Sequence, residues 1–341
     1  MGLGLSLLGE TEVQLNGKLI NSLGAAKARA LLFYLAVESD RAHRREVLAE
    51  MFWPGKPEGS GRNSLKQTLS LLRTSLGDRD AEEPFILSST RDLQFNTNSS
   101  HTVDLLEFEE LAQKVQDHCR SDQTCCPDCL ELLLEGVSLY RGDYLEDFYL
   151  PDSPDYNELI MTRRESSKRM MAQMLSMLIG CCQEDGDYKK AAGFSKQLVE
   201  LEPWSESSHR TLMHLLALSG KRSAALKQYQ SCENMLASEF NILPTAETRQ
   251  LYEDIKEWDQ KFKNPQKGSF PKSDGFPVED PPHTESSNIK TWVRISASIS
   301  ILVLIGFFYI IIERTWSGQS ITSTAEPTSS GTKTSPIQSV L

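Results

Sequence analysis

The sequence has few of the features that mark many enzymes and secreted proteins. It contains no Walker A sequence, no G-x-G-x-x-G and no H-E-x-x-H, and its six histidines are scattered. Seven cysteines among 341 residues are too few for a disulfide scaffold. Because no constellation of catalytic residue types is present, the sequence predicts a protein that is not an enzyme and has no cofactor.

The chain also lacks an overall excess of positive charge. It has 36 Lys and Arg against 47 Asp and Glu, so the net charge is −11. This total argues against a protein that coats nucleic acid along its whole surface. Residues 1–100 are neutral, with 12 basic and 12 acidic side chains, and residues 24–75 hold 9 basic against 5 acidic ones. Positive charge is therefore concentrated in one stretch of an acidic protein.

One long apolar run stands out near the carboxyl end. Residues 295–312 read ISASISILVLIGFFYIII, eighteen positions without a charge. At about 1.5 Å per residue a helix of this length spans roughly 27 Å, enough for the hydrocarbon core of a bilayer. Lys272, Lys290 and Arg294 precede the run, so the positive-inside rule places the large N-terminal part in the cytoplasm. The alternative is a buried core helix, but little sequence follows that could bury it.

Composition divides the rest of the chain. Residues 1–100 are mixed, and residues 101–260 are rich in Leu, Glu, Lys, Met and Ala with helical periodicity. Residues 261–291 hold five prolines and few large apolar side chains, which is typical of a flexible linker. The predicted transmembrane helix covers 292–313. The Ser-, Thr-, Gly- and Pro-rich residues 314–341 cannot bury enough apolar surface to fold and are predicted to be a disordered tail.

Three helices are predicted within the basic stretch, over 27–37, 44–52 and 62–76. In the third, RNSLKQTLSLLRTSL, four leucines recur on one face, and Asn63, Gln67, Ser70 and Thr74 form a polar stripe nearly opposite. Amides and hydroxyls on such a stripe can pair with base edges in the major groove, while flanking cations bind phosphates. The alternative is an ordinary amphipathic surface helix, whose polar face is only what solvent requires.

The segments around these helices favour the DNA-reading interpretation. LSLLGETEVQLNGKLI has short alternating segments around an Asn-Gly turn, which predicts a small sheet. PFILSSTRDLQF predicts a hairpin with Arg91 in its polar tip. A sheet, three helices and then a hairpin resemble an OmpR/PhoB-type winged helix, in which the hairpin is the wing and Arg91 is a candidate phosphate or minor-groove contact.

A second set of segments resembles a family. The segments that carry the resemblance are, in chain order, KARALLFYLAV, REVLAEMFWPG, GRNSLKQTLSLLRTSLG, the hairpin, LYRGDYLEDFYLPDSPDYNELIMTRRESSKRM and LPTAETRQLYEDIK. Over residues 3–258 the chain resembles SARP-type bacterial transcriptional activators. The resemblance implies a winged helix that binds promoter repeats, followed by a bacterial transcriptional activator domain for self-association and polymerase recruitment. Members often carry extra Arg or Lys before the first helix, where this chain has Gly24, Ala25 and Ala26.

A 34-residue period gives independent support for a tetratricopeptide-like helical part. The period relates Gly186 to Gly220, and it relates Ala191, Ser195 and Leu198 to positions 225, 229 and 232. This is the period of helix-turn-helix repeats, whose stacked pairs bury a continuous core and leave a concave groove for a partner. A plain helical bundle without a groove is the alternative.

The cysteines form one local cluster. His118, Cys119, Cys125, Cys126 and Cys129 lie within twelve residues, and Cys126-Pro-Asp-Cys129 has the spacing of half a zinc site. A second C-x-x-C is absent, and a free cysteine is often a small buried hydrophobe. The sequence therefore predicts no metal, with these four cysteines as the only weak candidate ligands.

The fold class predicted from the sequence is mainly α. An α+β winged helix-turn-helix domain over 1–100 precedes an all-α tetratricopeptide-like domain over 101–260, and one transmembrane helix follows. We expect a single-pass protein of the bacterial inner, cytoplasmic membrane with its N-terminal domains in the cytoplasm. Its function would be regulation of transcription as a DNA-binding protein, most simply as an activator.

The expected partners are double-stranded DNA, RNA polymerase, the membrane and a second copy of the chain. The candidate DNA-binding residues are Lys27, Arg29, Arg44, Arg45, Arg62, Asn63, Lys66, Gln67, Ser70, Arg73, Thr74 and Arg91. The competing hypothesis is a membrane-tethered interaction scaffold whose winged helix does not bind DNA. A pure scaffold has no reason to keep cations beside the polar stripe of the third helix.

Overall fold

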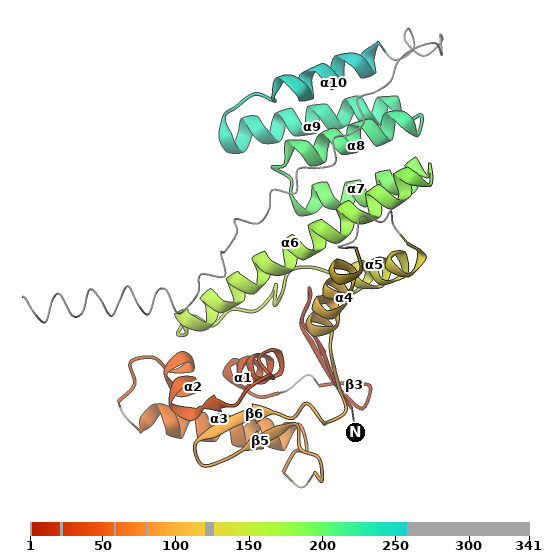
Figure 1. The fold of residues 1–341 in the computed structure, drawn as a ribbon. Coiled ribbons are helices and arrows are strands. Elements are labelled where there is room, and N and C mark those ends of the chain that lie inside the picture. The colour runs from red at the N-terminus through yellow and green to blue at the C-terminus, as the bar shows by residue number, and fades with distance from the viewer. Residues whose placement is uncertain (1, 21–22, 58, 80, 120–125, 258–341) are drawn as a thin grey trace, which may run out of the picture. The chain divides into compact units, whose positions relative to one another are not determined.

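A computed structural model describes residues 2–20, 23–57, 59–79, 81–119 and 126–257 (Figure 1). They all belong to one compact unit, Met1–Asn264. The predicted linker, transmembrane helix and tail lie outside the described residues. Among the helices that are described, none is long and apolar enough to cross a membrane.

The N-terminal sheet forms as predicted and gains a fourth strand. β1 (Leu3–Ser6), β2 (Glu12–Leu15) and β3 (Lys18–Leu19) are antiparallel neighbours. Asn16 and Gly17 turn the chain between β2 and β3 with φ of 53° and 73°, the left-handed region that an Asn-Gly hairpin turn requires. β7 (His101–Val103) pairs in parallel with β1, so this sheet uses three residues beyond the predicted boundary at 100.

The predicted helices and hairpin of the first domain are all present. α1 (Ala26–Val37), α2 (Arg45–Phe52) and α3 (Ser60–Ser75) are followed by the hairpin of β5 (Ile86–Ser88) and β6 (Asp92–Phe95). β4 (His43–Arg44) pairs with β6 and makes a three-stranded sheet in the order β4-β6-β5. Arg44, expected to begin a helix, is a strand residue because its backbone pairs with Asp92 of the hairpin.

The helical part follows β7, and successive helices contact one another along the chain, as Figure 1 shows for α6 to α10. In the described residues its helices are α4 (Asp104–Cys119), α5 (Pro127–Leu139), α6 (Pro154–Glu184), α7 (Tyr188–Leu201), α8 (Glu206–Leu218), α9 (Arg222–Phe240) and α10 (Ala246–Lys256).

The 34-residue period is the period of the buried helix faces. Gly186 and Gly220 both adopt positive φ just before α7 and α9 begin. The three other related pairs, Ala191 with Ala225, Ser195 with Tyr229 and Leu198 with Cys232, are all buried. The repeat interpretation of these helices therefore agrees with the packing. The concave groove expected for such repeats stays a prediction.

The two predicted domains share one hydrophobic core. Buried residues from β1, α1 and α2 belong to the same cluster as buried residues of α4 and α6. The rings of Phe52 and Tyr156 are 5.0 Å apart, and the hydroxyl of Ser153 donates to the Phe52 carbonyl at 3.1 Å. Arg163 of α6 pairs with Glu38, just after α1, at 2.6 Å. Residues after 140 thus help to build the core of the N-terminal part.

Asp104 is the polar centre of this junction. Its carboxylate accepts hydrogen bonds from the backbone N–H groups of Leu7 at 2.7 Å and Leu8 at 3.1 Å. The Arg141 guanidinium donates to the same carboxylate at 2.8 Å. A buried carboxylate with this many donors is stable only while all of them remain in place, so Asp104 fixes the end of β1 against the start of α4.

We predict that Asp104→Ala lowers the free energy of unfolding by about 2–4 kcal/mol, because the buried N–H groups of Leu7 and Leu8 would lose their acceptor. Urea unfolding of the full chain in mild detergent measures the change. Glu110→Ala, which removes an exposed ion pair with Lys114, is the matched control and should change stability by less than about 1 kcal/mol. Equal losses in the two variants would contradict this role for Asp104.

Candidate nucleic-acid interface

α3 has one buried and one open face, as predicted. Leu65, Leu69 and Leu72 are buried. Arg62, Asn63, Lys66, Gln67 and Thr74 are exposed, and Ser70 and Arg73 are half-buried. The helix forms because its leucines, spaced three and four residues apart, cover the core on one side only. Its polar face is therefore available to a ligand along the first two turns.

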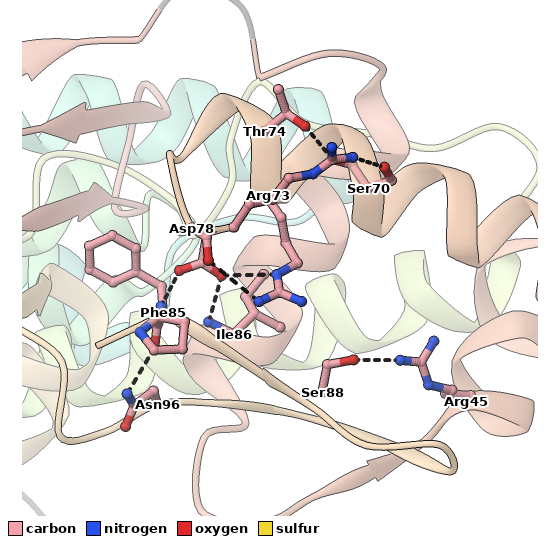
Figure 2. A network of polar contacts seen from close by, with 11 residues as sticks. Arg45, Ser70, Arg73, Thr74, Asp78, Phe85, Ile86, Ser88 and Asn96 are labelled. Carbon is pink, nitrogen blue, oxygen red and sulfur yellow. Dashed lines mark hydrogen bonds and ion pairs between the residues drawn. The ribbon is translucent and has the colours of Figure 1, made fainter. Parts of the chain in front are cut away.

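A buried carboxylate joins the end of α3 to the hairpin, as Figure 2 shows. Asp78, only 1% exposed, accepts hydrogen bonds from the backbone N–H groups of Phe85 and of Ile86, the latter at 3.2 Å. Arg73 pairs with the same carboxylate at 3.5 Å and donates to the Asp78 carbonyl at 3.4 Å. Arg73, predicted to bind a phosphate, therefore holds the hairpin to the helix.

Arg45 makes a second link to the hairpin. Its guanidinium donates to the hydroxyl of Ser88 at 2.6 Å and to the carbonyl of Ser89 at 3.1 Å (Figure 2 draws the Ser88 bond). Burial lowers the pKa of Arg45 from its ordinary value. The side chain is thus committed to the turn between β5 and β6, and it positions this turn relative to α2.

Two further candidate DNA-binding residues lie against aromatic rings. Lys27 donates to the Phe52 carbonyl at 2.5 Å and lies 5.2 Å from the centre of the Trp53 ring. Burial lowers its pKa. Arg29 lies 5.4 Å from the ring centre of Phe148. Both cations therefore stabilise the core around α1 within the protein.

Two residues of the predicted polar stripe and one cation beside it have internal partners as well. Arg62 pairs with Glu46 of α2. The Ser70 hydroxyl accepts a hydrogen bond from Arg79, and the Thr74 hydroxyl donates to the Ser70 carbonyl at 2.8 Å. The sequence could not predict these contacts because the partner groups belong to residues outside α3 or to the helix backbone.

Five of the predicted DNA-binding residues keep their side chains open. We call Arg44, Asn63, Lys66, Gln67 and Arg91 the exposed polar set. All five are exposed, and their side chains make no hydrogen bond, ion pair or ring contact with any residue that the structure describes. Asn63, Lys66 and Gln67 share one face of α3, whereas Arg44 belongs to β4 and Arg91 lies in the turn between β5 and β6.

The candidate cysteines lie at the corner between α4 and α5. The side chains of Cys126 and Cys129 come close to that of His118. The backbone N–H of Cys129 donates to the Cys126 sulfur at 3.3 Å and lowers the pKa of the Cys126 thiol. Cys125 lies outside the described residues, and the structure describes only the backbone of Cys119.

Comparison with known proteins bears on the helical part first. Residues 103–256 match the model of the Bacterial transcriptional activator domain. The match begins at the end of β7 and ends within the last turn of α10. It confirms the bacterial transcriptional activator domain that the resemblance implied, and it supports the likeness to SARP-type activators.

Two whole-protein relatives match over a longer stretch of the chain. The chain is 24% identical over 251 residues to the transcriptional regulatory protein MoaR1 of Mycobacterium tuberculosis, covering 73% of this chain and 78% of that one. It is 23% identical over 252 residues to MoaR1 of Mycobacterium bovis, with the same coverage.

A solved structure has a similar fold. The structure of Mycobacterium tuberculosis EmbR in complex with a low affinity phosphopeptide aligns with a TM-score of 0.56 and 22% sequence identity. The alignment covers 75% of this chain and 65% of the EmbR chain. At this identity the likeness concerns the fold, and it agrees with a mainly helical protein that carries small sheets.

We predict that Asp78→Ala loosens the hairpin relative to α3, because the N–H groups of Phe85 and Ile86 would lose a buried acceptor. Hydrogen exchange of the full chain should show the peptide containing these amides exchanging at least about tenfold faster, the equivalent of about 1.4 kcal/mol. Glu82→Ala removes an exposed acid from the same connection and should leave this exchange unchanged. Unaltered exchange in the Asp78 variant would contradict the proposed link.

Proposed function

We propose that this protein is a membrane-anchored transcription regulator that binds promoter DNA through α3 and the β5–β6 hairpin. The observation that carries the proposal is the open face of α3, where Asn63, Lys66 and Gln67 are exposed and have no partner within the described residues. The matches to transcriptional regulatory proteins and to the bacterial transcriptional activator domain support it.

The exposed polar set divides by chemistry. Asn63 and Gln67 carry amides, which pair with the donor and acceptor of adenine in the major groove, so they are the proposed base-reading residues. Lys66, Arg44 and Arg91 carry open cations, which suit phosphate oxygens. The remaining candidates hold α1, α2, α3 and the hairpin in place, so their contribution to binding is proposed to be indirect.

The two cationic places lie on different elements, which suits a winged helix. Lys66 belongs to α3, whereas Arg44 belongs to β4, which pairs with the hairpin, and Arg91 lies in the hairpin turn. Asp78 and Arg45 fix the hairpin to α3 and α2 respectively. A helix inserted in the major groove with a hairpin on the neighbouring backbone uses cations at both places.

The helical part is proposed to serve protein contacts. Stacked helix pairs of the tetratricopeptide-like kind bind partners along their exposed faces. We assign self-association and contact with RNA polymerase to residues 101–260, as the likeness to SARP-type activators suggests. Regulation as an activator follows the same likeness.

The membrane anchor is proposed on the sequence of 295–312 alone. The linker of 261–291 would have a root-mean-square extent of about 30 Å, which lets the DNA-binding part reach a promoter while the chain stays attached. The proposed location is the bacterial cytoplasmic membrane, with one pass and the N-terminal domains in the cytoplasm.

The phosphate role of the open cations is testable with the full chain in mild detergent. We predict that Lys66→Ala and Arg91→Ala each weaken binding to a random 30-base-pair duplex and lower the slope of log K against log salt by about 0.9. Fluorescence anisotropy over a salt series measures both. Lys227→Ala, an exposed lysine on α9, is the charge-matched control and should behave like the unchanged protein.

The base-reading role makes a different prediction. Asn63→Ala and Gln67→Ala should change which sequences are selected from a random duplex pool by about 1–3 kcal/mol at a single position, with the salt slope unchanged. If the full chain shows no salt-dependent duplex binding at all, the DNA-binding proposal fails and the interaction scaffold becomes the better account.

The anchor is tested by cell fractionation. We predict that the full chain sediments with membranes and resists extraction by high salt and alkaline carbonate, because a spanning helix is held by its apolar length. Deleting 295–312 should release the protein, whereas deleting 317–334, eighteen residues of the tail, should not. Release of the full chain by salt alone would rule out the anchor.

A further inference from the structure

A histidine and two cysteines meet where α4 and α5 join. His118 lies in the last turn of α4, Cys126 immediately precedes α5, and Cys129 lies in the first turn of α5. The Nδ1 atom of His118 is 3.1 Å from the Cys129 sulfur and 3.5 Å from the Cys126 sulfur. All three ligand atoms lie within 4.8 Å of one another.

These separations fit the edges of a zinc tetrahedron. With Zn–S bonds of about 2.3 Å and a Zn–N bond of about 2.0–2.1 Å, tetrahedral angles place nitrogen and sulfur about 3.6 Å apart and two sulfurs about 3.8 Å apart. The two measured nitrogen–sulfur distances lie within about 0.5 Å of the first value. The two sulfurs lie within 4.8 Å of each other, so they must approach by at most about 1 Å for the three ligand atoms to surround one ion.

We propose that His118, Cys126 and Cys129 bind one zinc ion. Binding would displace the thiol protons of the two cysteines, so that two thiolates balance the double charge of Zn²⁺ and a neutral imidazole completes the set. Three protein ligands leave one tetrahedral position for water or another donor.

The position of the ligands indicates a structural role. His118 comes from the end of one helix, while the cysteines flank the start of the next, so the ion would join α4 to α5 across their connection. The N–H of Cys129 already donates to the Cys126 sulfur, which would help to hold a thiolate facing the ion. α4 begins at Asp104, so the ion would stabilise a helix whose other end orders the domain junction.

The C-x-x-C pair could instead form a disulfide that responds to oxidation. The imidazole distinguishes the two interpretations, because Nδ1 lies within 3.5 Å of both sulfurs and a redox pair needs no such common neighbour. Soft thiolate ligands together with imidazole suit zinc, with copper as the main competitor. The geometry therefore favours the metal, and the disulfide is an outcome that the experiment can reveal.

The test uses the full chain, purified in mild detergent under reducing conditions and stripped of metal. Zn²⁺ is added, excess is removed by gel filtration, and bound zinc is counted by mass spectrometry. Co²⁺ replaces Zn²⁺ in a parallel sample, because thiolate-to-cobalt charge transfer and tetrahedral d–d bands report the ligands. The variants are His118→Ala, Cys126→Ser and Cys129→Ser. Cys232→Ala, a buried cysteine of α9, is the matched control.

We expect about one zinc ion per chain in the unchanged protein and in Cys232→Ala, with less than about a tenth of that in each ligand variant. The tetrahedral cobalt spectrum should disappear with the bound zinc. Added zinc should raise the thermal unfolding midpoint only where it binds, and circular dichroism at lower temperature checks that each variant is folded.

Three outcomes would overturn the proposal. The first is no zinc retention by the folded, reduced protein. The second is equal retention by all three ligand variants, which would place the metal elsewhere. The third is a Cys126–Cys129 disulfide that forms readily in air while the reduced protein ignores zinc, which would identify a redox pair.

Discussion

The carboxylate of Asp104 holds together elements that the sequence places far apart. It accepts the N–H groups that follow β1, lies at the first residue of α4, and pairs with Arg141 from the connection after α5. Around it, one apolar core continues from α1 and α2 into α6. Because core and carboxylate are shared, the N-terminal part and the first helices of the helical part form a single packed unit. A partner that displaces α4 or α6 would disturb the support of α3.

The proposed interface repeats this device on a smaller scale. Asp78 accepts the N–H groups of Phe85, just before β5, and of Ile86, the first residue of β5. In the same way Asp104 accepts those after β1, and each acid is paired with one arginine. In both places a buried acid replaces backbone partners that a strand end lacks. The cost is that Arg73, which was predicted to bind a phosphate, is used within the protein. The specificity of binding would then depend strongly on Asn63 and Gln67.

Local patterns predicted most of the elements. The spacing of leucines located α3, the Asn-Gly turn located β2 and β3, and the 34-residue period located the buried faces of α7 and α9. Pairings between distant segments could not be predicted, because a two-residue strand such as β4 has no periodicity of its own. Contacts between distant segments also decide which cations are open. The sequence therefore did not distinguish Lys66, which is open, from Lys27, which contacts Phe52 and Trp53. The sequence also could not predict that the His118 imidazole lies close to two thiols, because the fold of the α4–α5 corner brings these three side chains together.

The parallel pairing of β1 with β7 affects how the chain is made. Leu3 lies opposite His101, and Leu8 bridges to Tyr144, so the first strand has no complete set of neighbours until much later residues have left the ribosome. During that interval β1 and β2 form only a small hairpin sheet with an open edge, which is marginal by itself and prone to pair wrongly. Contacts of such large sequence separation are slow to form. Vectorial synthesis therefore leaves the beginning of this protein dependent on its middle, and chaperones would have their greatest effect before residue 145 emerges.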